Sequence, residues 1–171
     1  MSQDRANITP FERKLEGNAA YEEALDELLD TAVQTVRIFD RQLTHAFNTP
    51  RRFEAMRRLL LANRNHRIQI VLHETTNLVR ECPRLIILLR QFTHGITIRQ
   101  TMPTARNVYD PFAIADVAGH IHRFHYNSIR GLALSGDTAA THALLQRFAA
   151  LHEASRPASL GIQAADYERP A

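Results

Sequence analysis

The sequence alternates between stretches with a helical period and stretches with a strand period, and this alternation limits the folds that the chain can adopt. Apolar residues recur at helical spacing from Tyr21 to Val33, and acidic residues occupy the opposite side. A short alternating stretch follows, and the same helix-then-strand order occurs twice more by residue 101. Helices between successive strands place those strands in parallel with crossover connections. The pattern therefore predicts an α/β domain.

The second half of the chain changes this rhythm. An apolar stretch, a tight turn at Ala118 and Gly119, and two further alternating stretches predict consecutive strands without helices between them. A final helix carries its apolar stripe from Thr141 to Leu151, and we take Asp137 as its capping residue. The six predicted strands are residues 36–40, 68–72, 96–99, 112–116, 121–124 and 129–134.

Two prolines mark further helix starts. Thr49 followed by Pro50 has the form of a cap residue followed by proline in the first turn. Pro83 opens another helix, because a proline in a helix interior would cost ~3 kcal/mol. We therefore place the start of that helix near Cys82.

Composition is that of one globular domain. The chain has 171 residues, of which 44% are hydrophobic and 23% are charged, and its one cysteine, Cys82, cannot form an internal disulfide. The polar start lacks the apolar core of a signal peptide, and no apolar run approaches the ~20 residues of a membrane span. We expect a cytoplasmic protein without membrane contact, with an N-terminal arm at residues 1–18, one domain at 19–155 and a mobile tail at 156–171.

Residues 109–128 (YDPFAIADVAGHIHRFHYNS), GLALSG at 131–136 and DTAATHALLQRFAALHEAS at 137–155 form a more specific pattern. Together they resemble the C-terminal part of one phospholipase D repeat, and the preceding element order is similar from about residue 19. The resemblance implies an α-β-α sandwich with a mixed, mostly parallel sheet. The chain is also similar to a proteobacterial group of degenerate domains. Some members of that group follow an acetyltransferase domain, which makes an acetyltransferase a candidate protein partner.

The catalytic motif of the resembled family is broken. Counting back from Asp116, the histidine of the family falls on Tyr109 and its lysine falls on Pro111. The Gly-Ser-x-Asn stretch falls near residues 123–127, where only Asn127 matches. The family chemistry requires a histidine nucleophile and a lysine that holds anionic oxygens. We therefore expect no enzyme, but a binding or regulatory domain whose ligand the sequence does not identify.

A ligand pocket of such a domain would lie beyond the carboxyl ends of the parallel strands. The residues at those ends and at the old motif are our candidates for ligand binding, although solvated strand ends would look the same. They are Asp40, Arg41, His73, Arg99, Tyr109, Asp116, His122, His125 and Asn127. Closely spaced histidines can bind zinc or copper. Because no cysteine accompanies His120, His122 and His125, we expect neither a metal nor another cofactor.

Two alternative functions stay open. Arginines crowd one predicted helix and the loop after it, and such a patch can bind the phosphates of nucleic acid. The patch consists of Arg51, Arg52, Arg57, Arg58, Arg64 and Arg67. Aromatic residues for base stacking are absent from the patch, so a solvated helix face explains it equally. The second alternative is a phosphodiesterase with a relocated active site that uses histidines.

The resemblance also bears on assembly. Two-repeat phospholipase D enzymes build their active site between two such halves, and single-repeat members pair as symmetric dimers. A single half is expected to keep an apolar or aromatic surface around the old cleft, with His122, Phe124, His125 and Tyr126 as candidates. We therefore expect a homodimer. The alternative is a monomer in which the closing helix or residues 1–17 cover this surface.

Overall fold

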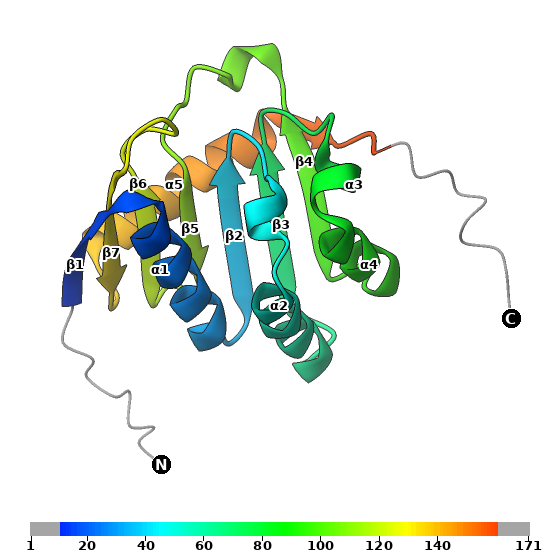
Figure 1. The fold of residues 1–171 in the computed structure, drawn as a ribbon, viewed down its shortest axis with the longest axis horizontal. Coiled ribbons are helices and arrows are strands. Elements are labelled where there is room, and N and C mark those ends of the chain that lie inside the picture. The colour runs from blue at the N-terminus through cyan, green and yellow to red at the C-terminus, as the bar shows by residue number, and fades with distance from the viewer. Residues whose placement is uncertain (1–10, 161–171) are drawn as a thin grey trace, which may run out of the picture.

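The computed structural model describes residues 11–160, which form one eight-stranded sheet with helices on both faces (Figure 1). The strand order is β1-β7-β6-β5-β2-β3-β4-β8. Helices α1 to α4 lie in front of the sheet in Figure 1, and α5 crosses behind it. This arrangement confirms the expected α/β sandwich.

The strands are β1 (Phe11–Glu16), β2 (Thr35–Asp40), β3 (Arg67–Leu72), β4 (Ile96–Thr101), β5 (Phe112–Ala115), β6 (Gly119–Arg123), β7 (Arg130–Ser135) and β8 (Ser155–Pro157). The helices are α1 (Gly17–Thr31), α2 (Pro50–Ala62), α3 (Leu78–Glu81), α4 (Pro83–Gln91) and α5 (Ala139–Glu153), with short 3-10 turns at His45–Phe47 and Pro103–Ala105. Between residues 11 and 160, no helix is long and apolar enough to cross a membrane.

The expectation of a mostly parallel sheet is wrong. Only β2 with β3 and β3 with β4 pair in parallel, and the other neighbours pair antiparallel. Helical crossovers between neighbouring strands join only β2 to β3 and β3 to β4, whereas the chain reaches β5 by a loop that re-enters the sheet in the opposite direction. The tight connections between β5, β6 and β7 then permit antiparallel pairing alone. All six predicted strands are present.

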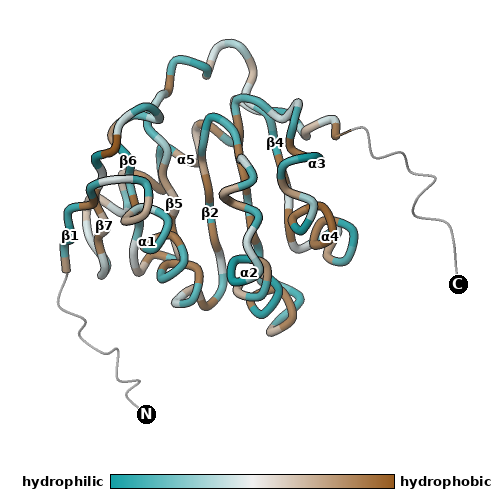
Figure 2. Tube along the Cα trace, viewed as in Figure 1, coloured by the Kyte–Doolittle hydropathy of each residue, from teal (hydrophilic) through white to brown (hydrophobic). Residues whose placement is uncertain are grey.

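Two hydrophobic cores lie on opposite faces of the sheet. The larger core packs the front helices through residues such as Leu29, Met56 and Leu88. The smaller core packs α5 through Phe148 against Phe39 of β2 and its neighbours. Figure 2 shows hydrophilic segments on the outer side of α1 and α2, as expected for amphipathic helices on a sheet. The sheet is therefore covered on both faces around its central strands.

Both edge strands and the short helix α3 are absent from the sequence-based prediction. Strand β1 comes from the segment expected to be an arm, and it pairs with β7 although Leu15 is its one fully buried residue. Strand β8 lies partly in the expected tail and pairs with β4. Residues 1–10 of the expected arm and 161–171 of the expected tail lie outside the described residues.

The helix starts follow the sequence signals with one exception. Thr49 caps α2 by accepting a hydrogen bond from the Arg52 N–H, and Cys82 precedes Pro83 at the start of α4. Thr138, not Asp137, caps α5, because its hydroxyl accepts from the Thr141 N–H. Either side chain satisfies the sequence rule, so the choice depends on which residue precedes the first helical turn.

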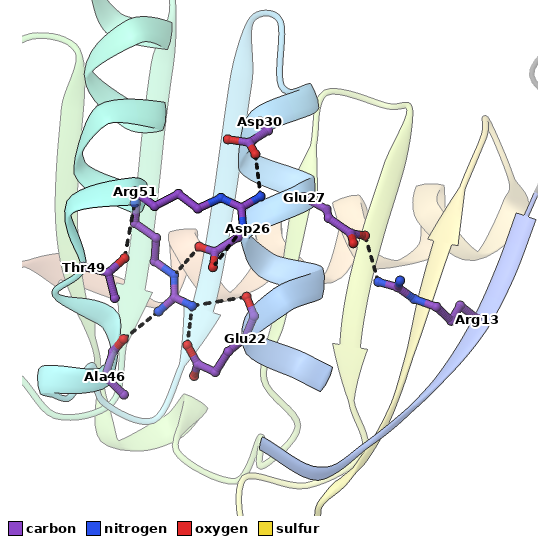
Figure 3. Close-up of polar contacts among 9 residues, drawn as sticks. Arg13, Glu22, Asp26, Glu27, Asp30, Ala46, Thr49 and Arg51 are labelled. Atoms are coloured by element: carbon purple, nitrogen blue, oxygen red, sulfur yellow. Dashed lines mark hydrogen bonds and ion pairs between the residues drawn. The ribbon is translucent and has the colours of Figure 1, made fainter. Parts of the chain in front are cut away.

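The guanidinium group of Arg52 joins α2 to α1 and to the loop after β2. Figure 3 labels its partners Glu22, Asp26 and Ala46. The side chain is 2% exposed. Its Nε donates to Asp26 at 2.9 Å, one terminal nitrogen donates to the Ala46 carbonyl at 2.7 Å, and the other is paired with the Glu22 carboxylate. The Phe47 ring lies 5.6 Å from the guanidinium carbon. A buried charge persists only when it is paired and hydrogen-bonded, so these contacts hold the three segments together.

We predict that Arg52→Ala lowers the free energy of unfolding by about 3–5 kcal/mol, because it removes a buried guanidinium and leaves Asp26, which is 15% exposed, and the Ala46 carbonyl without this partner. Urea unfolding followed by circular dichroism measures this loss. Arg57→Ala is the matched control on the same helix, since Arg57 is exposed and lies 3.9 Å from Glu54. The control should stay within about 0.5 kcal/mol of the native protein. An equal effect of the two substitutions would contradict the role assigned to Arg52.

Candidate functional site at the carboxyl edge

A pocket of about 240 Å³ opens where β2 ends at Asp40. Its walls come from the first turns of α1, the loop after β2 and the turn between β6 and β7. This is the carboxyl edge of the parallel strands, where open α/β sheets usually bind their ligands. We call it the carboxyl-edge pocket. Its chemically active lining residues are Tyr21, Asp40, Arg41, Arg123, Tyr126 and Asn127.

Asp40 is the most perturbed acid of this pocket. Burial raises the pKa of its carboxyl to about 7, against the opposing effects of the Arg41 N–H and the Arg123 charge. The Arg41 N–H donates to the carboxylate at 2.7 Å. Burial also raises the pKa of the neighbouring Tyr21 phenol, and the charge of Asp40 adds to this rise. A carboxyl group with such a pKa changes its charge near neutral pH.

Arg123 is held in place at the end of β6. Its guanidinium carbon lies 5.7 Å from the centre of the Tyr21 ring, and its side chain donates to the Ser128 carbonyl and to Asn18. Neither Tyr21 nor Arg123 was predicted from the sequence as a site residue. Tyr21 belongs to the apolar stripe of a helix, and Arg123 is one arginine among many. Only the packing of α1 beside β6 brings them together.

Three aromatic rings pack together at one side of the pocket, and we call them the aromatic cluster: Tyr109, His125 and Tyr126. Of these, Tyr126 lines the pocket. The rings of His125 and Tyr126 stack with centres 4.4 Å apart, and Tyr109 lies 5.8 Å from His125. The Tyr126 N–H donates to the Tyr109 carbonyl at 2.8 Å. The guanidinium carbon of Arg41 lies 4.8 Å from the Tyr126 ring. The structure thus brings five of the predicted residues together here, with Asp40 and Asn127 in the pocket wall.

His73 and Arg99 are engaged elsewhere. The His73 ring is buried, with Nδ1 2.6 Å from the Thr101 hydroxyl and Nε2 2.6 Å from the Val108 carbonyl. Arg99 donates to the hydroxyl and the carbonyl of Ser155. Both side chains hydrogen-bond to other parts of the chain, and neither lines the carboxyl-edge pocket.

Asp116 lies at the opposite edge of the sheet. It follows β5, and roughly 20 Å of extended chain separate it from Tyr109. Its backbone φ is +53°, and its carboxylate accepts hydrogen bonds of 2.8–2.9 Å from the N–H groups of Val33, Gln34 and Thr35. The side chain therefore closes the connection between α1 and β2 and does not line the carboxyl-edge pocket, and its role in ligand binding stays a prediction.

His122 belongs to a separate network on the α5 side of the sheet. Its Nε2 lies 2.7 Å from the Asp110 carboxylate, which Arg147 of α5 also contacts through two nitrogens. Burial alone would raise the pKa of Asp110, but the hydrogen bonds from Arg147 and His122 outweigh it and lower that pKa. His120 is buried and bonded to Thr141, and burial lowers its pKa to about 4. In the described part of the chain, no three metal-ligating side chains are grouped to hold an ion.

A comparison with protein families identifies the family of the chain. The family model described as a domain of unknown function, DUF7931, matches residues 17–160. The chain belongs to this family. None of the curated proteins compared with it matches.

Solved structures with the same fold include members of the phospholipase D family. Nuc from Salmonella typhimurium, described as a phospholipase D family member, superposes with a TM-score of 0.60 at 17% identity, over 88% of this chain and 99% of its own. NucT from Helicobacter pylori gives 0.59 at 14% identity, over 88% and 100%. TrmBL2, described as an archaeal chromatin protein with a novel mode of DNA binding, gives 0.63 at 12% identity, over 91% of this chain and 56% of its own. The DUF7931 domain therefore has a phospholipase D-like fold.

The arginines of α2 in this DUF7931 domain mostly contact protein groups. Arg52 is buried and bound to Glu22, Asp26 and the Ala46 carbonyl, so its predicted role in phosphate binding is wrong. Arg51 pairs with Asp30 at 2.8 Å, and Arg58 donates to two carbonyls at the end of α1. Arg67 donates to carbonyls of its own loop. Arg51, Arg57, Arg58 and Arg64 are exposed, but the contacts of Arg51 and Arg58 with α1 leave the patch smaller than the sequence indicates.

The raised pKa of Asp40 predicts a pH-dependent stability. An unfolded aspartate has a pKa of about 3.9, whereas Asp40 in the folded protein has one of about 7. Between these values the unfolded chain releases a proton that the folded protein retains, so the contribution of Asp40 to stability is lost as pH rises through this window. Asp40→Asn removes the effect.

Thermal unfolding of the native protein and of Asp40→Asn from about pH 4.5 to about pH 8 measures this pH dependence of stability. The native protein should lose stability relative to Asp40→Asn as the pH rises. Parallel profiles of the two proteins would show that Asp40 is not perturbed by burial.

Proposed function

We propose that this DUF7931 domain is a non-catalytic binding domain that has kept a phospholipase D-like fold and uses the carboxyl-edge pocket as its binding site. The proposal rests on the residues found at two positions just before β5. Tyr109 and Pro111 stand where the resembled family has its histidine and lysine. Pro111 is buried, and its carbonyl accepts from the Arg123 N–H at 2.8 Å.

The replaced residues cannot supply the family chemistry. Proline has no side-chain donor for phosphate oxygens. A phenol is a poor nucleophile unless an adjacent base activates it. The neighbouring rings of the aromatic cluster contain one imidazole, that of His125, and its Nδ1 accepts from the Asn127 N–H at 3.0 Å. A base or nucleophile at the phosphorus atom is thus missing from the rim of the pocket.

The remaining groups support binding of a small anionic ligand. The guanidinium groups of Arg41 and Arg123 suit carboxylate or phosphate oxygens. Arg41 has one carboxylate partner, Glu74, at 3.4 Å across an exposed pair, which a ligand can replace at small cost. Asp40 in its protonated form can donate a hydrogen bond to the same ligand. The aromatic cluster offers a ring face at the rim.

The two alternatives have weaker support. Nucleic-acid binding through α2 would rely on exposed Arg57 and Arg64, because the other arginines of that patch contact protein groups. The likeness to TrmBL2 concerns the fold alone. A relocated phosphodiesterase would need histidines in one cleft, yet His120, His122 and His125 have separate partners.

We predict that the purified protein hydrolyses neither bis(p-nitrophenyl) phosphate nor nucleic acid, because no nucleophile replaces the missing histidine. Release of p-nitrophenolate and gel analysis of DNA and RNA measure this, with an active phosphodiesterase as positive control. Tyr109→Phe should behave as the native protein does. Turnover that disappears in Tyr109→Phe would overturn the proposal.

We further propose that the domain forms a homodimer with the old cleft near the two-fold axis. Phe124 and Tyr109 support this, since they are 54% and 51% exposed at the same edge, and burying such a patch in both copies is favourable. Light scattering at micromolar concentration tests it. Phe124→Ser should shift the mass toward the 19.5 kDa of one chain. The control Ile87→Ser replaces an exposed residue of α4 and should leave the mass unchanged.

A native mass of one chain at every concentration would contradict the dimer. A dimer that Phe124→Ser leaves intact would show that a different face is used.

A further inference from the structure

A second pocket of about 400 Å³ lies on the back face of the sheet, between α5 and strands β2 and β3. We call it the back-face pocket. It shares no lining residue with the carboxyl-edge pocket. Its polar lining residues are Arg37, Gln69, His152 and Glu153, and its apolar wall includes Leu145 and Phe148 of α5. The volume falls within the roughly 300–1,000 Å³ typical of small-molecule sites.

Arg37 is a charged residue without a counter-ion at this pocket. Its neighbours Val36 and Ile38 enter the large front core, so the alternation of β2 turns Arg37 toward α5. The side chain is partly buried, and burial lowers its pKa while the Asp116 charge opposes this effect. Within residues 11–160 its guanidinium makes no ion pair, and the Asp116 oxygens accept backbone N–H groups. Partly buried arginines normally have partners.

Glu153 gives the same pocket a negative end. It is the last residue of α5, and its exposed carboxylate makes no ion pair with any other residue that the structure describes. The C-terminus of a helix carries partial negative charge, which also favours a cation there. A simple anion would meet repulsion from Glu153, and a simple cation would meet repulsion from Arg37.

The groups between these charges are neutral hydrogen-bonding partners. Gln69 lies beside Arg37 in the register of β2 and β3. Burial lowers the pKa of His152, and the charge of Arg99 lowers it further, so its imidazole is neutral at neutral pH. The pocket thus combines one cationic group, one anionic group and an apolar wall.

We propose that the back-face pocket binds a small zwitterion with an apolar body, of the type of an apolar α-amino acid. Its carboxylate pairs with Arg37, its ammonium group pairs with Glu153, and its side chain packs on Leu145 and Phe148. Arginine forms bidentate contacts with carboxylates, which fits this assignment. The site is independent of the carboxyl-edge pocket and of the function proposed for it.

Isothermal titration of the full chain with free L-leucine tests the proposal, with isocaproate and isoamylamine as analogues that each lack one charged group. Leucine should bind, and each analogue should bind at least about tenfold more weakly. Arg37→Gln should weaken leucine binding about tenfold or more, but it should not weaken isoamylamine binding, because it removes a repulsive charge. Glu153→Gln should weaken leucine binding, but it should not weaken isocaproate binding, for the same reason. Arg90→Gln, an exposed arginine on α4, is the matched control and should bind leucine as the native protein does.

Absence of leucine binding by the native protein would overturn the proposal. Isocaproate binding as tightly as leucine would also overturn it, because the pocket would then be a simple anion site. These ligand comparisons use the native protein, so they hold even if a variant folds poorly.

Discussion

The buried guanidinium of Arg52 is the interaction on which the arrangement of the carboxyl edge depends. It ties α1, the loop after β2 and α2 into one unit through Glu22, Asp26 and the Ala46 carbonyl. Helix α1 and the loop after β2 also form walls of the carboxyl-edge pocket. Buried ion pairs contribute less to stability than their contacts suggest, because desolvation offsets the attraction. We interpret this one as a device that fixes geometry.

The side chains at the two ends of the parallel strands have different roles. At the amino edge, Asp116 accepts three backbone N–H groups and closes the connection into β2. At the carboxyl edge, Asp40 and Tyr126 line an open pocket, and the rings of Tyr109 and His125 lie beside Tyr126. In the proposed alignment with the resembled catalytic motif, Asp116 is the residue that survives, and here it has a structural role. The same alignment places Tyr109 and Pro111 at the positions that would carry the chemistry, and the proposed binding function rests on it.

Much of the fold could be predicted from the sequence, because hydrophobic period and helix starts are local properties. The six predicted strands are all present, since their apolar residues form either an alternating pattern or, in β5, a continuous run. Strand direction was wrong because it depends on the connection and not on the strand itself. The edge strands β1 and β8 were missed because a charged edge strand buries little apolar surface, and Leu15 alone gives no recognisable alternation.

The site was only partly predictable for a related reason. Asp40 and Arg41 lie near Tyr109 because β5 runs antiparallel to β2, so the segment before β5 lies at the edge where β2 ends. His73 follows β3 and Arg99 lies in β4, and the partners of both side chains come from other segments of the chain. The burial of Arg52 was equally invisible, since an arginine on an amphipathic helix is normally solvated. Contacts between distant segments decide whether a polar side chain is free for a ligand.

The most direct test of the account is one NMR experiment on isotopically labelled protein with a phosphodiester added. Binding without chemistry predicts amide shifts confined to the loop after β2 and the turn between β6 and β7, with a phosphorus signal that stays that of the intact diester. Appearance of a phosphomonoester signal would contradict the loss of catalysis. Amide shifts centred on the exposed side of α2 would contradict the location of the binding site.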